Sequence, residues 1–270
     1  MKFSYFVGAA RLELATFGPP AQRSSHLNYA PFASLLYQIS TPYSVIITLM
    51  KKRALVAIFA HPDDESFGPG GSLALYSKTH DVFLICVTLG QSGKNHHNGD
   101  IKNIAKIRCQ ELLDSAKILG IKKVFFLNYK DGALSNDKYH KIADEIQKIT
   151  DKLKPEILLT FEERGVSGHI DHIVLSMITH FIFYKVKYAK KLMLFCESEK
   201  MISMLRSDYF IYIPQGYNTK NVDKVIDTSQ VYDLKVSAMR QHRSQKKDVI
   251  KVLKVREKLP RQELFIVKTK

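Results

Sequence analysis

From residue 53 onward, apolar and polar positions follow two distinct patterns. Short, almost wholly apolar runs predict buried strands at 54–60, 81–89, 122–129, 156–161 and 191–198. Between them, apolar residues recur every three or four positions, which predicts amphipathic helices at 71–79, 101–120, 139–154 and 172–186. Gly120 and Pro155 end two of these helices, as glycine and proline commonly do.

Alternation of apolar strands with helices predicts a parallel sheet that is covered on both faces. We therefore expect an α/β protein with a Rossmann-like, three-layer αβα sandwich and a mostly parallel sheet. A ligand is then expected outside the carboxyl ends of the strands, where the strand order reverses. No GxGxxG motif follows the first strand, so a dinucleotide-binding fold is not supported.

Residues 1–49 differ from the rest of the chain. They hold four of the nine prolines and only four charged residues, and neither helical nor strand periodicity persists in them. We expect 1–49 to be an N-terminal extension without a fold of its own, with Met50 as the true start and 50–270 as the domain. A weak membrane anchor at 32–50 is the competing interpretation, which Pro42 and several polar residues disfavour.

The net charge of +15 and the pI near 9.6 can indicate binding to nucleic acid or to an anionic membrane. The lysines are scattered along the predicted helices, however, and no zinc-finger, RNP or RGG pattern occurs. The charge is typical of a lysine-rich solvated surface. We expect neither nucleic acid nor a membrane as a partner, whereas an anionic substrate stays open.

The three cysteines are Cys86, Cys109 and Cys196, and they form no CxxC pair. An odd number of thiols in apolar or helical surroundings indicates reduced core residues. A cytoplasmic location is therefore expected.

Two polar clusters directly follow apolar strands. AHPDDE, at 60–65, supplies His61 and Asp64, and GHIDH, at 168–172, supplies His169, Asp171 and His172. The carboxyl ends of parallel strands meet at one edge of a sheet, so the two clusters are expected to converge. Two histidines and one carboxylate are the usual protein ligands of a catalytic zinc, with water in the fourth position.

The remaining acidic residues suggest a hydrolytic mechanism. Asp63 is placed next to a ligand and can take a proton from the zinc-bound water as a general base. Asp171 can hydrogen-bond His169 and hold it protonated. His169 would then stabilise an oxyanion or protonate the leaving group, so the set predicts hydrolysis of an acyl bond.

AHPDDE followed by GHxDH resembles the signature of the LmbE-like, or PIG-L, family of zinc-dependent deacetylases. The resemblance extends from about residue 52 to about 265. Weaker features appear in order: GPGGSLAL, an Arg-x-x-Glu helix, NYKDGAL, PEILLT and KVSAMRQHRSQ. The resemblance implies a metal-dependent hydrolase that removes the N-acetyl group from an N-acetylglucosamine-containing small molecule or conjugate.

The resemblance also implies residue roles. His61, Asp64 and His172 match the zinc ligands, Asp63 the catalytic base, and His169 with Asp171 the electrophilic or acidic partner. Arg108 and Asp131 match positions that hold the sugar. Each of the weaker matches also has a structural alternative. Arg108 can form an ordinary helical pair with Glu111, and Asp131-Gly132 can be a plain turn. His242, in KVSAMRQHRSQ, can be a surface histidine instead of one that lines the site.

Two positions depart from the family pattern. Gln91 replaces a glutamate, which affects the expected substrate more than the metal chemistry, and Ile170 stands where proline is common. The polar segment 94–100 is expected to be a loop.

Three other functions stay open. They are a zinc amidase for another acylated amine, a basic binding protein with a merely structural metal, and a membrane-tethered deacetylase. Structural zinc sites favour four protein ligands and cysteine, which argues against the second of these. Another divalent metal could replace zinc, and assembly into a homo-oligomer is not decided by the sequence.

Overall fold

The computed structural model describes residues 53–93, 103–205 and 212–270. The predictions for the extension 1–49 and for the loop 94–100 lie outside these residues and stay predictions. Lys51–Lys270 form one compact unit. Within the described ranges, no helix has the length and apolar character needed to cross a membrane.

All five predicted strands and all four predicted helices form, with ends shifted by a few residues. The strands are β1 (Arg53–Phe59), β2 (His80–Thr88), β3 (Lys123–Tyr129), β4 (Ile157–Phe161), β5 (Lys191–Cys196), β6 (Lys224–Asp227) and β7 (Gln262–Thr269). The helices are α1 (Asp64–Phe67), α2 (Gly70–Ser77), α3 (Ile104–Ile118), α4 (Tyr139–Leu153), α5 (Gly165–Gly168), α6 (Ile170–Lys185), α7 (Glu199–Met204), α8 (Tyr232–Met239) and α9 (Lys246–Arg256), with 3-10 turns η1 (Thr219–Asn221), η2 (Ser229–Val231) and η3 (Arg243–Gln245).

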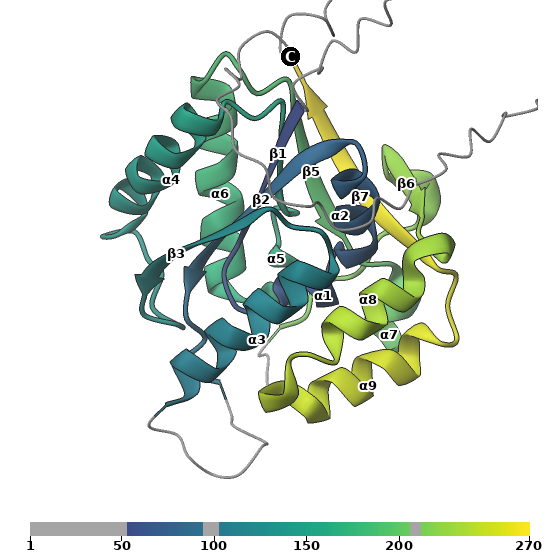
Figure 1. The fold of residues 1–270 in the computed structure, drawn as a ribbon. Helices are drawn as coiled ribbons and strands as arrows, with labels where there is room; N and C mark the ends of the chain where they lie inside the picture. Colours follow the sequence, from purple (N-terminus) through teal and green to yellow (C-terminus); the bar gives the residue numbers. More distant parts are fainter. Residues whose placement is uncertain (1–52, 94–102, 206–211) are drawn as a thin grey trace, which may run out of the picture. The chain divides into compact units, whose positions relative to one another are not determined.

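The strands form one sheet in the order β3-β2-β1-β4-β5-β7-β6. Strands β1 to β5 pair with one another in parallel, and β7 runs antiparallel to both β5 and β6. Helices α4 and α6 cover one face, and α2, α3 and α8 cover the other (Figure 1). The predicted αβα architecture with a mostly parallel sheet is therefore confirmed.

The central strand β1 explains where the polar motifs meet. Its residues from Leu55 onward are at most 1% exposed, because β2 and β4 flank the strand and helices cover both faces. The strand order reverses here, since β2 pairs with one edge of β1 and β4 with the other. The first histidine motif follows β1 and the second follows β4. Both motifs therefore lie at the switch point where such sheets bind ligands.

Candidate metal and catalytic site

The first motif makes a sharp turn at the end of β1. Oδ2 of Asp64 accepts hydrogen bonds from the backbone N–H groups of Ala60 at 3.1 Å and His61 at 2.7 Å. Asp63 has φ of 126°, a conformation that is costly for a residue with a Cβ atom. Its N–H donates to Oε2 of Glu65 at 3.1 Å, so side chains of the motif itself stabilise the turn.

The second motif lies at the start of α6. His169 caps this helix, because its Nδ1 accepts the backbone N–H of Asp171 at 3.2 Å. His172 is in the first turn, where its Nδ1 lies 3.1 Å from the carbonyl oxygen of Gly165. A carbonyl only accepts, so Nδ1 carries the ring proton and Nε2 keeps its lone pair. The ring stacks on Phe161 with centroids 3.9 Å apart, which fixes its direction.

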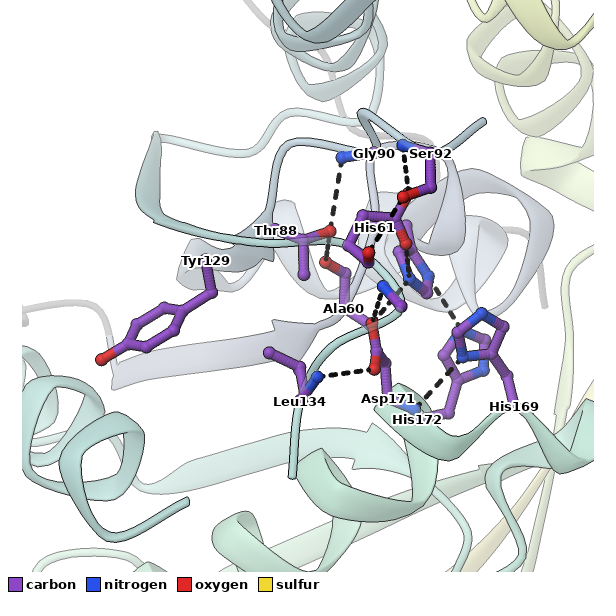
Figure 2. Close-up of polar contacts among 12 residues, drawn as sticks. Ala60, His61, Thr88, Gly90, Ser92, Tyr129, Leu134, His169, Asp171 and His172 are labelled. Atoms are coloured by element: carbon purple, nitrogen blue, oxygen red, sulfur yellow. Dashed lines mark hydrogen bonds and ion pairs between the residues drawn. The ribbon is translucent and has the colours of Figure 1, made fainter. Parts of the chain in front are cut away.

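His61, Asp64 and His172 form a triangle of candidate metal ligands. Nδ1 of His61 lies 3.1 Å from Nε2 of His172 and 3.5 Å from Oδ2 of Asp64, and Nε2 of His172 lies 3.4 Å from Oδ1 of Asp64. Figure 2 shows the two imidazoles pointing toward one another. Ligands about 2.0–2.2 Å from a tetrahedral metal are about 3.3–3.5 Å apart. The two imidazoles contact different oxygens of Asp64, so this carboxylate lies beside both rings at separations close to that range.

The far edge of His61 faces two carboxylates. Its Nε2 lies 3.0 Å from Oδ1 of Asp131 and 3.4 Å from Oδ2 of Asp171. Burial alone would lower the pKa of His61, but Asp131, Asp171 and Asp64 outweigh it and raise that pKa well above its usual value. A carboxylate behind a metal-binding histidine is a common arrangement that orients the ring and increases its basicity.

Two further groups of ligand-type atoms occur within the described ranges, and both include His61. One adds His169 and His172, and the other adds Asp131 and Asp171. Nδ1 of His169 is occupied by the Asp171 N–H. Asp131 and Asp171 accept backbone N–H groups from neighbouring loops. Asp64 accepts two backbone N–H groups as well, but both bind Oδ2, so its Oδ1 keeps its lone pairs beside Nε2 of His172. The set with Asp64 is therefore the candidate metal site.

Asp63 lies beside the triangle and keeps part of its carboxylate accessible, with the side chain 18% exposed. Its Oδ2 accepts a hydrogen bond from Nη2 of Arg108 at 2.8 Å. Burial and the neighbouring Asp64 raise the pKa of Asp63 to about 6, against the opposing effects of Arg108, His242 and His61. A carboxylate with such a pKa can both accept and return a proton near neutral pH.

The predicted bond between the Asp171 carboxylate and His169 is wrong. That carboxylate accepts the backbone N–H groups of Gly132 at 2.8 Å and Leu134 at 3.1 Å, and it faces His61. Burial and the nearby His61 and His172 lower the pKa of His169 to about 4. The geometry agrees with a neutral ring, because Nδ1 of His169 accepts the N–H of Asp171 and a charged ring would carry a proton on this nitrogen.

Arg108 does not form the alternative helical pair with Glu111. It is buried, and its guanidinium donates to the carbonyl oxygens of Pro62 at 2.6 Å and Gly90 at 2.9 Å as well as to Asp63. A Cβ atom at Gly90 would lie 2.4 Å from this guanidinium, so glycine is needed there. Glu111 accepts from the N–H and hydroxyl of Ser244 instead of pairing with Arg108.

Asp131 is likewise turned toward protein groups. Its Oδ2 accepts the N–H of Ser92 at 3.0 Å, and its Oδ1 faces His61. The interpretation of Asp131-Gly132 as a turn alone is thus wrong. Contact of Arg108 or Asp131 with a sugar stays a prediction.

The amide of Gln91 accounts for the departure from the family glutamate. Its Oε1 accepts the N–H of Leu89 at 3.1 Å, while its Nε2 donates to the carbonyl oxygen of Tyr129 at 3.2 Å. Only an amide serves both partners, because a carboxylate has no donor. The other departure, Ile170, is 67% exposed and leaves the motif around it intact.

The surface interpretation of His242 is wrong. The side chain is fully buried, and its Nε2 lies 2.8 Å from Oε1 of Glu65. Glu65 belongs to the first motif but was not among the predicted site residues. Its position next to two other acids was the one signal that could have singled it out.

Comparison with known proteins gives a consistent result. The model of the family described as "PIG-L: GlcNAc-PI de-N-acetylase" matches residues 56–182. A probable N-acetyl-alpha-D-glucosaminyl L-malate deacetylase 2 from Bacillus subtilis (strain 168) is 30% identical over 218 residues, covering 79% of this chain and 91% of the relative.

Two further matches extend this result. A 1D-myo-inositol 2-acetamido-2-deoxy-alpha-D-glucopyranoside deacetylase from Corynebacterium glutamicum (strain R) is 28% identical over 220 residues, covering 71% of this chain and 74% of the relative. The structure of N,N'-diacetylchitobiose deacetylase from Pyrococcus horikoshii superposes with a TM-score of 0.62 and 21% identity, covering 80% of this chain and 84% of that one. The superposition with the chitobiose deacetylase shows similarity of fold.

Proposed function

The chain belongs to the PIG-L family of N-deacetylases, and from this premise we propose its metal, its catalytic residues and its substrate class. It hydrolyses the acetamide of an N-acetylglucosamine-containing small molecule, with water as the nucleophile and zinc as the cofactor. The single observation that carries the proposal is the approach of His61, Asp64 and His172. The two imidazole nitrogens are 3.1 Å apart, and each lies 3.4–3.5 Å from one oxygen of Asp64. Another divalent ion is the alternative.

The donor set suits a catalytic more than a structural metal. It has two imidazoles and one carboxylate, and it contains no cysteine. When bound at these ligands, zinc supplies Lewis-acid chemistry, which lowers the pKa of water and polarises an acyl oxygen. This choice of ligands also argues against a binding protein whose metal only supports the fold.

Asp63 is proposed to move the proton. As a carboxylate it takes a proton from the attacking water while the water oxygen bonds to the acetamide carbon. When the C–N bond breaks, the protonated Asp63 returns this proton to the amine nitrogen. The products are acetate and the free amino sugar. The pKa of about 6 for Asp63 supports both steps.

His169 is proposed to stabilise the oxyanion. Its Nδ1 accepts the N–H of Asp171, so the neutral ring carries its proton on Nε2 and can donate it to developing negative charge. The low pKa of His169 argues against the alternative role as a general acid. Asp171 and Asp131 orient His61 from behind.

The substrate class follows the names of the relatives. Conjugates of N-acetylglucosamine with malate or inositol, and diacetylchitobiose, are the first candidates. Arg108 and Asp131 are kept as candidate sugar-binding residues. A cytoplasmic location is part of the proposal, supported by the free thiols of Cys86, Cys109 and Cys196.

The test is release of free amine by the full chain from these three compounds and from N-acetylglucosamine, with zinc and with a chelator. We expect release from at least one of them, its loss with chelator and its return with zinc. Release that persists after complete metal removal would disprove the metal-dependent chemistry. Stoichiometric zinc binding without release from any compound would redirect the assignment to other acylated amines.

A further inference from the structure

The short helix α1, which carries Asp64 and follows Asp63, is held by side chains from the C-terminal part of the chain. Lys235, His242 and Arg256 each reach it from a different element, and none of them lies within the matched range 56–182. We propose that His242, acting through Glu65, is a positioning residue for Asp63. The inference rests on the proposed function, because it assumes that Asp63 is the base.

The first link joins Asp63 to Glu65. The backbone of Asp63, with φ of 126°, favours glycine, yet glycine would remove the carboxylate. A strained conformation persists only where its surroundings fix it. Oε2 of Glu65 does so by accepting the Asp63 N–H at 3.1 Å.

The second link fixes Glu65 itself. Its Oε1 accepts the hydroxyl of Ser115 at 2.5 Å and lies 2.8 Å from Nε2 of His242. A carboxylate has only acceptors, so Nε2 of His242 is the donor. Glu65 is 1% exposed and His242 and Ser115 are fully buried, so no solvent can replace these bonds. The orientation of Glu65 is therefore set by α3 and by the residue that precedes η3.

Two cationic side chains, Lys235 and Arg256, hold the carboxyl end of α1. Nζ of Lys235 donates to the carbonyl oxygen of Gly68 at 2.5 Å, and Nη2 of Arg256 donates to that of Phe67 at 2.7 Å. These carbonyls lie at the carboxyl end of the helix, where positive charge is favourable. Lys235 and Arg256 thus fix the end of α1, while His242 and Glu65 fix its beginning.

A purely structural role explains this arrangement poorly. Burying polar and charged groups is costly, and apolar residues of similar size often stabilise a core as well or better. Here the hydrogen bonds of His242 and Lys235 converge on the loop that carries the base and a metal ligand. That convergence indicates that the free-energy cost of burying these polar groups is offset by their function, which is to hold Asp63 in position.

The test compares His242→Leu, which loses the donor, with His242→Gln, whose amide N–H can replace Nε2–H. His180→Leu is the matched control, since His180 is a partly buried histidine on α6 outside the site. We expect kcat of His242→Leu, measured with saturating zinc, to fall about 10- to 100-fold with KM unchanged, because small misplacements of a reacting group are this costly. His242→Gln should recover most of the loss.

Hydrogen exchange of the peptide that spans residues 60–68 gives a readout that does not depend on the substrate. Exchange should accelerate in His242→Leu and stay slow in His242→Gln and His180→Leu. Wild-type exchange in His242→Leu, or equal losses of kcat in the Leu and Gln variants, would overturn the inference. If the wild type releases no amine at all, the proposed function fails, while the exchange experiment still decides whether His242 restrains the loop.

Discussion

Nε2 of His61 lies 3.0 Å from Oδ1 of Asp131, although the two residues follow different strands, β1 and β3. With His61 as a proposed metal ligand, this contact predicts that Asp131 supports metal binding. We expect Asp131→Asn to weaken zinc affinity about 10- to 100-fold, because a carboxylate behind a ligand histidine orients it and increases its basicity.

A competition titration with a zinc-binding dye measures this change. Asp137→Asn is the control, since that side chain is 72% exposed in the same loop region. Unchanged zinc affinity together with a raised KM would instead assign Asp131 to the sugar.

Asp63→Asn should keep the metal and lose turnover. The amide preserves the size of the side chain but cannot take a proton from water, so kcat is expected to fall about 10²- to 10⁴-fold. Zinc content by mass spectrometry and kcat on the best substrate are the two measurements. The exposed Asp144→Asn, on α4, should behave as wild type. Loss of zinc from Asp63→Asn would make Asp63 a ligand.

Gln91→Glu tests why this chain departs from the family pattern. A carboxylate would place an acceptor opposite the carbonyl oxygen of Tyr129 and lose the bond that is 3.2 Å long here. The expected loss is about 1 kcal/mol in the free energy of unfolding, measured by urea denaturation. The exposed Gln230→Glu should change it little. A Gln91→Glu variant as stable as wild type would show that this bond contributes nothing.

Glu263→Gln should change how the stability of the fold depends on pH. Burial alone would raise the pKa of Glu263, but Lys235 and the N–H of Ser72 outweigh it and hold that pKa below its usual value. Since the pKa is lowered in the folded state, Glu263 stabilises the fold above about pH 4.5, and this stabilisation is lost as the pH falls further.

The variant should therefore be less stable by several kcal/mol at pH 7, as expected when one partner of a buried ion pair is removed. The difference from wild type should shrink between pH 4.5 and lower values. Urea unfolding of both metal-free proteins from pH 7 to pH 3.5 measures it. A difference that does not vary with pH would contradict the assignment of charge to Glu263.

The parallel core and the placement of both histidine motifs could be predicted because both are local in sequence. A buried strand needs only a run of apolar residues, and a residue just past its end must lie at the carboxyl edge of the sheet. The run at 54–60 and the motif at 60–65 therefore carry enough information by themselves. The C-terminal strands β6 and β7 were not predicted, although β7 contains the apolar run 264–267.

The partners of individual polar groups could not be predicted. Asp171 is two residues from His169, which suggested a bond, yet its carboxylate binds the backbone around Gly132, 39 residues away. His242 lies 177 residues from Glu65. Such pairings depend on how helices dock on the sheet, and the local pattern of apolar and polar residues does not encode this.

The position of β7 in the sheet has a consequence for the order in which the chain folds. It lies between β5 and β6 and pairs with both, so the sheet cannot be completed until residues 262–269 have been synthesised. Until then the nascent chain carries an unpaired edge at β5, which is open to association with other chains. Glu263 on this strand also binds Lys235, so the restraint on α1 is completed only after residue 263 has left the ribosome.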